Sequence, residues 1–157
     1  MKFLKLFSII AILGIFTGCA SIPSPAEMEA DIEGFVLPQL PEDGNAIVYV
    51  VRPSSLGGLV RFKVFIDDKE VESEMGFTRG KQYVYFNLTP GEHQILSQAE
   101  NTASVAVTAS AGDIIFIQQD AQMGVLFARN SASTIPELEG KYYVKNLSLG
   151  TVNKVDR

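Results

Sequence analysis

From residue 45 onward, the chain is built of short runs in which every second residue is apolar. Residues 60–66 place Val, Phe, Val and Ile at alternate positions, the period of a strand that buries one face. Residues 46–52 are apolar at almost every position, as expected of a central strand covered on both sides. Turn dipeptides such as Pro90-Gly91 recur at intervals of about 8–12 residues. The pattern predicts an all-β fold, a small antiparallel β-sandwich over residues 45–157.

The same alternation assigns faces to individual strands. In residues 81–88, we expect Tyr83 and Tyr85 on one face and the residues between them on the other. Residues 134–140 predict one helical turn closed by Gly140, and residues 141–149 are expected to form a last strand rather than a short helix. The expected strands are residues 46–52, 60–67, 81–88, 92–99, 103–108, 113–119, 122–129 and 141–149.

The first eighteen residues have the pattern of an export signal. Lys2 and Lys5 are the only charged residues before Glu27, and they precede an almost unbroken apolar run over residues 6–16. A basic start followed by an apolar run of roughly 7–15 residues is typical of a secretory signal peptide. A membrane-spanning helix needs about 20 apolar residues, so this run is short for a span. Residues 1–18 are therefore expected to be a signal peptide.

The apolar run ends in Gly18-Cys19, which resembles a bacterial lipobox. The resemblance implies that Cys19 becomes the first residue of the mature chain and binds the membrane through acyl chains. Neither Ala20 nor Ser21 is the aspartate that retains enterobacterial lipoproteins in the inner membrane, which implies the outer membrane facing the periplasm. Two alternatives are ordinary cleavage with release into the periplasm, and a buried core cysteine. The export pattern around Cys19 favours the lipid anchor.

Residues 19–44 differ in composition from the segments on either side. They hold four of the seven prolines and six acidic residues. Prolines remove backbone donors and stiffen the chain, so the segment is expected to be a Pro-rich tether behind the lipidated N-terminus. Residues 26–35 predict a short helix with Met28, Ile32 and Phe35 on one side. The sequence leaves open whether that helix packs on the domain or belongs to a free linker.

Three stretches resemble the bacterial lipoprotein domain known as domain of unknown function 2846. They are Ala46-Ile47-Val48-Tyr49-Val50-Val51-Arg52-Pro53, then Phe62-Lys63-Val64-Phe65-Ile66-Asp67-Asp68, and finally Tyr83-Val84-Tyr85-Phe86 with Pro90-Gly91-Glu92-His93. The resemblance covers roughly residues 44–127. It implies an immunoglobulin-like or PEGA-like sandwich in which the Pro-Gly-Glu-His turn joins two strands. It implies no activity, because the family has none assigned.

Charge and composition exclude several classes of site. The net charge is −5, and it becomes −7 when residues 1–18 are removed with their two lysines. An acidic chain lacks the basic footprint that binds phosphate backbones, so we expect no nucleic acid partner. A single cysteine excludes an internal disulfide and a cysteine-cluster zinc site, and a single histidine weakens any metal site. We expect no cofactor and no metal.

His93 follows the Pro90-Gly91 turn and is the only histidine. A metal-binding or acid–base role would need partners of the same kind. The favoured interpretation is structural: the imidazole hydrogen-bonds nearby backbone and fixes the hairpin. Pro90, Gly91 and His93 are thus expected to form a structural turn.

Acidic residues offer two further candidates. Asp68, Glu70, Glu72 and Glu74 would line one face of a strand, where a straight row suits a solvated edge better than calcium. Asp67, Asp113 and Asp120 would have to meet at a defined separation to act as hydrolytic carboxylates. No Gly-x-Ser-x-Gly elbow and no phosphate-binding glycine loop is present in the sequence.

Arg52 closes an otherwise apolar strand and is followed by Pro53-Ser54-Ser55, with Arg61 nearby in sequence. Its structural interpretation is to hold the following loop through hydrogen bonds to carbonyls or a carboxylate. Its functional interpretation is to bind an anionic group, such as a peptidoglycan carboxylate, beside a surface of Tyr49, Tyr83 and Tyr85. Aromatic rings on a sheet are more often core than sugar-stacking surface.

These observations favour a non-enzymatic, lipid-anchored envelope lipoprotein whose sandwich is a structural or protein-interaction module. The first alternative is a module that binds peptidoglycan or another glycan, and the second is a small hydrolase. A concave pocket around Arg52 and the tyrosines would favour glycan binding. A flat apolar patch or an exposed strand edge would favour a protein partner.

Overall fold

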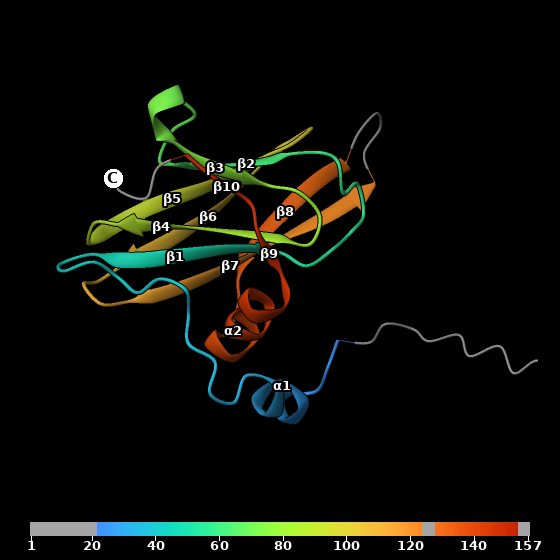
Figure 1. The fold of residues 1–157 in the computed structure, drawn as a ribbon. Helices are drawn as coiled ribbons and strands as arrows, with labels where there is room; N and C mark the ends of the chain where they lie inside the picture. The colour runs from blue at the N-terminus through green and yellow to red at the C-terminus, as the bar shows by residue number, and fades with distance from the viewer. Residues whose placement is uncertain (1–21, 124–127, 154–157) are drawn as a thin grey trace, which may run out of the picture.

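A computed structural model describes residues 22–123 and 128–153 (Figure 1). Over these ranges the chain forms two α-helices, one 3-10 helix (η1) and ten strands. The helices are α1 (Pro25–Asp31), η1 (Val71–Ser73) and α2 (Glu137–Asn146). The strands are β1 (Ala46–Arg52), β2 (Phe62–Ile66), β3 (Glu74–Thr78), β4 (Gln82–Leu88), β5 (Gly91–Gln98), β6 (Thr102–Ala109), β7 (Ile114–Met123), β8 (Ala128–Thr134), β9 (Ser148–Leu149) and β10 (Thr151–Val152).

The strands form two five-stranded sheets that pack face to face, so the predicted β-sandwich is confirmed. Sheet A has the order β8-β7-β1-β4-β9, and sheet B has the order β10-β3-β2-β5-β6. Sheet B is antiparallel, but sheet A is mixed, because β1 pairs in parallel with β7 and β4 in parallel with β9. The reason is the crossover after β6: the chain leaves sheet B and enters sheet A beside β1, running in the direction of β1.

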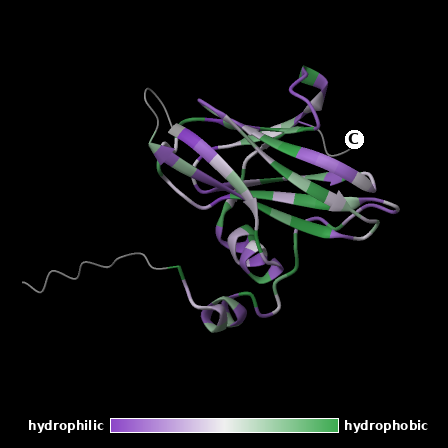
Figure 2. Ribbon diagram, turned by 180° about the vertical axis from the view of Figure 1, so that it is seen from behind, coloured by the Kyte–Doolittle hydropathy of each residue, from purple (hydrophilic) through white to green (hydrophobic). Residues whose placement is uncertain are grey.

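The space between the sheets is filled by an apolar core. β1 contributes Ala46, Val48 and Val50, and the residues of β4 that face the core are Val84, Phe86 and Leu88. Sheet B contributes Val64, Ile66, Met75, Ile95, Val107 and Ala109. Hydrophobic residues accordingly concentrate in the central strands of the sandwich, whereas both helices are mixed (Figure 2). The faces that the alternation assigned to β1 and β4 are confirmed.

The opposite face of sheet A is also buried. Ile47, Tyr49 and Val51 of β1 pack with Tyr83 of β4 and Phe116 of β7 in a second apolar cluster. The cover comes from Tyr143 and Val144 of α2 and from Leu37 of the N-terminal segment. We call α1, α2 and residues 32–40, which follow α1 and lead toward β1, the helical layer. It lies on the side of sheet A away from sheet B (Figure 1). All seven residues of β1 are buried, as predicted for a central strand.

The prediction of a strand over residues 141–149 is wrong, because these residues belong mostly to α2. Gly140 does not end the helix but lies within it, pressed against the ring of Phe116. A Cβ at Gly140 would be 2.2 Å from the Phe116 ring, so any larger residue would push α2 away from sheet A. Tyr143 and Val144 continue the buried face at helical spacing.

The Pro-rich tether contains the expected short helix, and it packs on the domain rather than forming a free linker. Ser24 and Glu27 form a reciprocal capping box at the start of α1, with Pro25 in the first turn. Met28 is buried, and Asp31 is bound by α2 through Lys145 and through Asn146 Nδ2 at 2.8 Å. The N-terminal segment is therefore part of the fold from Ile22 onward.

Contacts between the two sheets are present on both lateral sides of the sandwich. On one side, the last residues cross from sheet A to sheet B, with β9 beside β4 and β10 beside β3. Gly76 makes this crossing sterically feasible, because a Cβ there would lie 2.1 Å from the Thr151 carbonyl oxygen. On the other side, Asn101 and Asn130 exchange hydrogen bonds between the sheets, with Asn130 N donating to Asn101 Oδ1 at 2.8 Å.

The segment after β2 and the segment around the end of β7 differ from the predictions. Strand β3 was not expected, and the connection before it turns through η1, so Asp68, Glu70, Glu72 and Glu74 do not form a row on one strand. The expected strand over residues 122–129 is divided between the end of β7 and the start of β8, and residues 124–127 lie outside the described part of the chain. The predicted signal peptide and Cys19 also lie outside the described residues.

We predict that Tyr49→Phe loosens the helical layer. The Tyr49 hydroxyl donates to the Gln39 carbonyl at 2.6 Å and accepts from Gln39 N at 3.0 Å, which fixes the tether to β1. Loss of both bonds leaves partly buried backbone groups unpaired, so we expect a destabilisation of about 1–3 kcal/mol in equilibrium urea denaturation. Tyr85→Phe is the matched control, because no hydrogen bond of its hydroxyl appears within the described residues. Equal stability of both variants would contradict the assignment.

Candidate functional site

Arg52 lies at the end of β1 with its side chain fully buried on the inner face of the sandwich. Its Nη1 donates to the Val60 carbonyl at 2.7 Å, and its Nη2 donates to the carbonyls of Leu56 and Gly57 at 2.9 Å each. The guanidinium carbon lies 3.6 Å from the centroid of the Phe62 ring. Arg52 thus holds the loop between β1 and β2, which confirms the structural interpretation of this residue.

The electrostatics of Arg52 follow from its burial. Desolvation lowers the pKa of the guanidinium to about 10, which leaves it charged at neutral pH. Three carbonyl dipoles and the face of Phe62 replace the lost water around the charge. Nη1 and Nη2 donate to the chain itself, whereas Nε is buried without a partner among the described residues. Because the whole side chain is buried, it is not available to a ligand from solvent.

Tyr49, Tyr83 and Tyr85 do come together, but on the other face of sheet A. The Tyr49 ring lies 6.2 Å from the Tyr83 ring and 5.7 Å from the Tyr85 ring, centroid to centroid. Tyr49 and Tyr83 are buried beneath the helical layer, and only Tyr85 is partly exposed. Desolvation raises the pKa of Tyr49 to about 12 and also raises that of Tyr83. Sheet A separates Arg52 from the tyrosines, so the predicted binding surface that combines them does not form.

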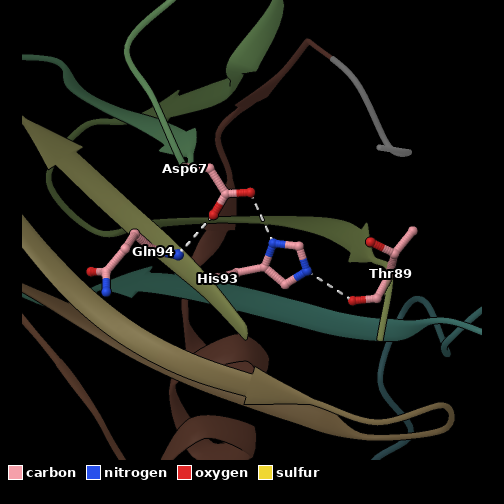
Figure 3. A network of polar contacts seen from close by, with 4 residues as sticks. All are labelled: Asp67, Thr89, His93 and Gln94. Carbon is pink, nitrogen blue, oxygen red and sulfur yellow. Dashed lines mark hydrogen bonds and ion pairs between the residues drawn. The ribbon is translucent and has the colours of Figure 1, made fainter. Parts of the chain in front are cut away.

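His93 of β5 connects the end of β2, through Asp67, with the turn between β4 and β5, through Thr89 (Figure 3). Its Nε2 donates to the Thr89 carbonyl at 3.0 Å, and its Nδ1 lies 2.9 Å from Asp67 Oδ2. The other oxygen of Asp67 accepts from Gln94 N at 2.9 Å. The bond to Thr89 spans the Pro90-Gly91 turn. This turn joins β4 of sheet A to β5 of sheet B, so the expectation that His93 fixes a hairpin is wrong, because the two strands do not pair with each other. Asp67 is an additional partner that the sequence did not indicate.

A groove beside His93 is lined by both polar and apolar side chains. Its walls are Asp67, Glu92, His93, Gln94, Ala106, Val107 and Thr108. Within the described ranges, no three His, Cys, Asp or Glu side chains gather closely enough to hold a metal ion. The polar atoms of His93 and Asp67 already bind the chain, which fits a structural role for this network.

The candidate carboxylates serve turns and strands rather than a common centre. Asp113 accepts from Ser110 N at 2.8 Å in the turn before β7. Asp120 accepts from Gln118 Nε2 at 2.6 Å further along the same strand. Asp113 and Asp120 lie seven positions apart along extended chain, a distance of about 23 Å. These two cannot form the carboxylate pair that glycoside hydrolysis requires.

A cationic cluster that sequence reasoning missed lies on the outer face of sheet B. The guanidinium carbons of Arg61 and Arg79 lie 4.6 and 5.2 Å from the centroid of the Phe77 ring. Lys63 is adjacent through the pairing of Lys63 with Phe77, and it forms an ion pair with Glu74 at 2.7 Å. Arg61 is exposed and Arg79 is partly exposed. We call Arg61, Phe77 and Arg79 the arginine cluster; locating it required β3, the strand that was not expected.

The fold and these sites define a small β-sandwich with a helical layer on one side, and comparison with known proteins gives its family. The family model described as "Protein of unknown function (DUF2846)" matches residues 42–132. The chain belongs to this family, as the resemblance of the three sequence stretches predicted.

Two relatives are similar in sequence. An uncharacterized protein of Haemophilus influenzae is 26% identical over 143 residues, which cover 90% of this chain and 82% of that protein. Sulfate adenylyltransferase subunit 1 of Rhizobium tropici is 32% identical over 108 residues, which cover 63% of this chain but only 20% of that protein. The family and the Haemophilus relative have no described activity, which is compatible with an unassigned function here. Among the described helices, none is long and apolar enough to cross a bilayer.

We predict that Arg52→Ala destabilises the protein by about 3 kcal/mol or more, because it leaves three loop carbonyls unpaired and removes a buried side chain. Arg52→Lys keeps a charge but not the planar set of donors, so an intermediate loss is expected. Arg129→Ala, at an exposed position of β8, is the control and should change stability by less than about 0.5 kcal/mol. Urea denaturation measures all three. A fully stable Arg52→Ala protein would refute the role of Arg52 in holding the loop.

Proposed function

We propose that the protein is a non-enzymatic lipoprotein of the bacterial envelope, anchored through acyl chains on Cys19. Its β-sandwich serves as a structural or protein-interaction module, and by its Ala20 and Ser21 it belongs at the outer membrane. The observation that carries the proposal is the order of Lys2 and Lys5, the apolar residues 6–16 and Gly18-Cys19. Several acyl chains together, at about 0.8 kcal/mol per buried CH2, hold a protein stably at a membrane.

Features of the described domain support a role without catalysis. The side chains of His93 and Arg52 form hydrogen bonds to backbone carbonyls of the chain itself. On one side of the sandwich, β8 and β6 are the edge strands of their sheets. A protein partner could therefore contact a strand edge as well as exposed side chains on this scaffold.

We predict that Cys19→Ala abolishes the anchor. Mass spectrometry of the wild-type protein should show a mature chain that begins at Cys19 with acyl chains attached, and the variant should carry none. The wild-type protein should fractionate with the outer membrane, and Ala20→Asp should shift it to the inner membrane in an enterobacterial host. An unmodified Cys19 in the wild-type protein would refute the proposal.

A second candidate function, binding of an anionic glycan such as peptidoglycan, is favoured by the arginine cluster. Arg61 and Arg79 place two guanidinium groups over the ring of Phe77, at a surface where Arg61 is exposed and Arg79 is partly exposed. Guanidinium groups bind carboxylates through paired hydrogen bonds. The glycan hypothesis based on Arg52 and the tyrosines finds no support, because Arg52 and Tyr49 are buried.

We predict that Arg61→Ala with Arg79→Ala weakens binding to purified peptidoglycan about tenfold, equivalent to about 1.4 kcal/mol. The fold should persist, since exposed cation–π contacts contribute only about 0.5–1 kcal/mol each. Arg129→Ala removes one exposed arginine elsewhere and should bind like the wild-type protein. Sedimentation with peptidoglycan at low and high salt measures the effect. If neither variant changes binding, or if the wild-type protein does not bind, the structural role stands alone.

A further inference from the structure

The helical layer lies at the place where the chain approaches the proposed anchor. Cys19 precedes Ile22, the first described residue, by three positions. Three residues span at most about 10–11 Å, even when fully extended. Whatever path residues 19–22 take, the acylated residue must therefore lie within about 11 Å of Ile22.

Ile22 and Pro23 lie beside the helical layer, where Ile22 is 68% exposed. They line one groove together with Tyr143 of α2 and a second groove together with Met28 of α1. The described part of the chain therefore begins next to both helices.

The layer itself is fixed to the sandwich. Asp31 of α1 contacts Lys145 and Asn146 of α2, and Met28 is only 5% exposed. Tyr49 holds Gln39, at the far end of the same segment, to the centre of sheet A. The Pro-rich segment is therefore not a long spacer, because the residues between the anchor and the folded chain are too few to let the domain turn over.

We propose that the helical layer faces the bilayer surface and that the outer face of sheet B, with the arginine cluster, faces away from it. This inference rests on the proposed lipid anchor at Cys19. Figure 1 shows α1 and α2 on the side of sheet A opposite to sheet B. Sheets pack about 10 Å apart and a helix is about 10–12 Å across, so sheet B lies at least about 20 Å beyond α1.

Charge places the layer at the headgroups rather than in the hydrocarbon. The helical layer carries six acidic residues, Glu27, Glu29, Asp31, Glu33, Glu137 and Glu139, against Lys141 and Lys145, which pair with Glu137 and Asp31. Glu27, Glu29 and Glu33 are exposed, and the hydrogen bond from the Ser24 backbone lowers the pKa of Glu27, which keeps it ionised. Carboxylates are costly in the bilayer interior and are repelled by anionic headgroups within a Debye length of about 8 Å. The acyl chains hold the layer close while its charges keep it from inserting.

The chain contains no tryptophan, so a single introduced tryptophan reports its own position. The lipidated protein is reconstituted in vesicles of phosphatidylethanolamine and phosphatidylglycerol that carry a nitroxide on the headgroup or bromine on the acyl chain. Ala30→Trp places the probe on the exposed side of α1, and Ala106→Trp places it on the outer face of β6. We expect the headgroup nitroxide to quench the probe at residue 30 several-fold more than the probe at residue 106. Acyl-chain bromine should quench neither.

A second pair, Glu29→Trp and Ser104→Trp, repeats the comparison at other exposed positions of α1 and β6, in case a first variant misfolds. Equal quenching at both faces, or stronger quenching on β6, would overturn the orientation while leaving the anchor intact. Quenching by acyl-chain bromine on α1 would overturn the surface position. A probe on α1 that is shielded from iodide but not quenched by lipid would mean that a protein covers this layer, which also overturns the proposal. Absence of acyl mass on Cys19 would overturn the anchor, and the orientation with it.

Discussion

The central strand β1 has no side that faces solvent, and the rest of the architecture follows from this constraint. Its even-numbered residues, such as Val48, require sheet B as their cover, and its odd-numbered residues, such as Tyr49, require a third layer. Burial of an apolar side chain is worth about 1.5–3 kcal/mol, so neither face can be left open without a large loss of stability. The chain meets the second demand with α2 and with the residues before β1. A segment that by composition is a spacer thereby becomes part of the core.

How far the sequence determines the fold depends on whether a feature is local. The two faces of β1 and β4 follow from a period of two and were predictable. The helix α2 was not predicted, although Gly140, Tyr143, Val144 and Leu147 have helical spacing. Gly140 was interpreted as a helix end because glycine favours ends, whereas here it serves close packing against Phe116. That contact joins residues 24 positions apart, and nothing local in the sequence distinguishes the two uses of glycine.

The candidate site shows the same division. The role of Arg52 in holding its loop was one of two interpretations, and the residue type alone did not decide between them. Parity decides it: Arg52 shares the inner face of β1 with Val50, whereas Tyr49 is on the outer face. The arginine cluster lay beyond sequence reasoning because it depends on the register that sets Phe77 opposite Lys63. The sequence identified which charged and aromatic side chains could take part in binding, and strand pairing determined which of them lie close together.

The burial of β1 also links the fold to the orientation of the protein at a membrane. Part of the cover over Tyr49 comes from Leu37 and Gln39, which belong to the segment that leads back to the proposed anchor. Packing this segment on the sheet therefore also shortens the tether. A longer free spacer would let either sheet meet a partner, whereas a docked segment commits the helical layer to one side. What remains for recognition is the outer face of sheet B, where the chain, acidic overall, concentrates Arg61, Lys63 and Arg79. A cationic cluster on an acidic protein would select partners by charge, and the proposed anchor would leave that cluster turned away from the membrane.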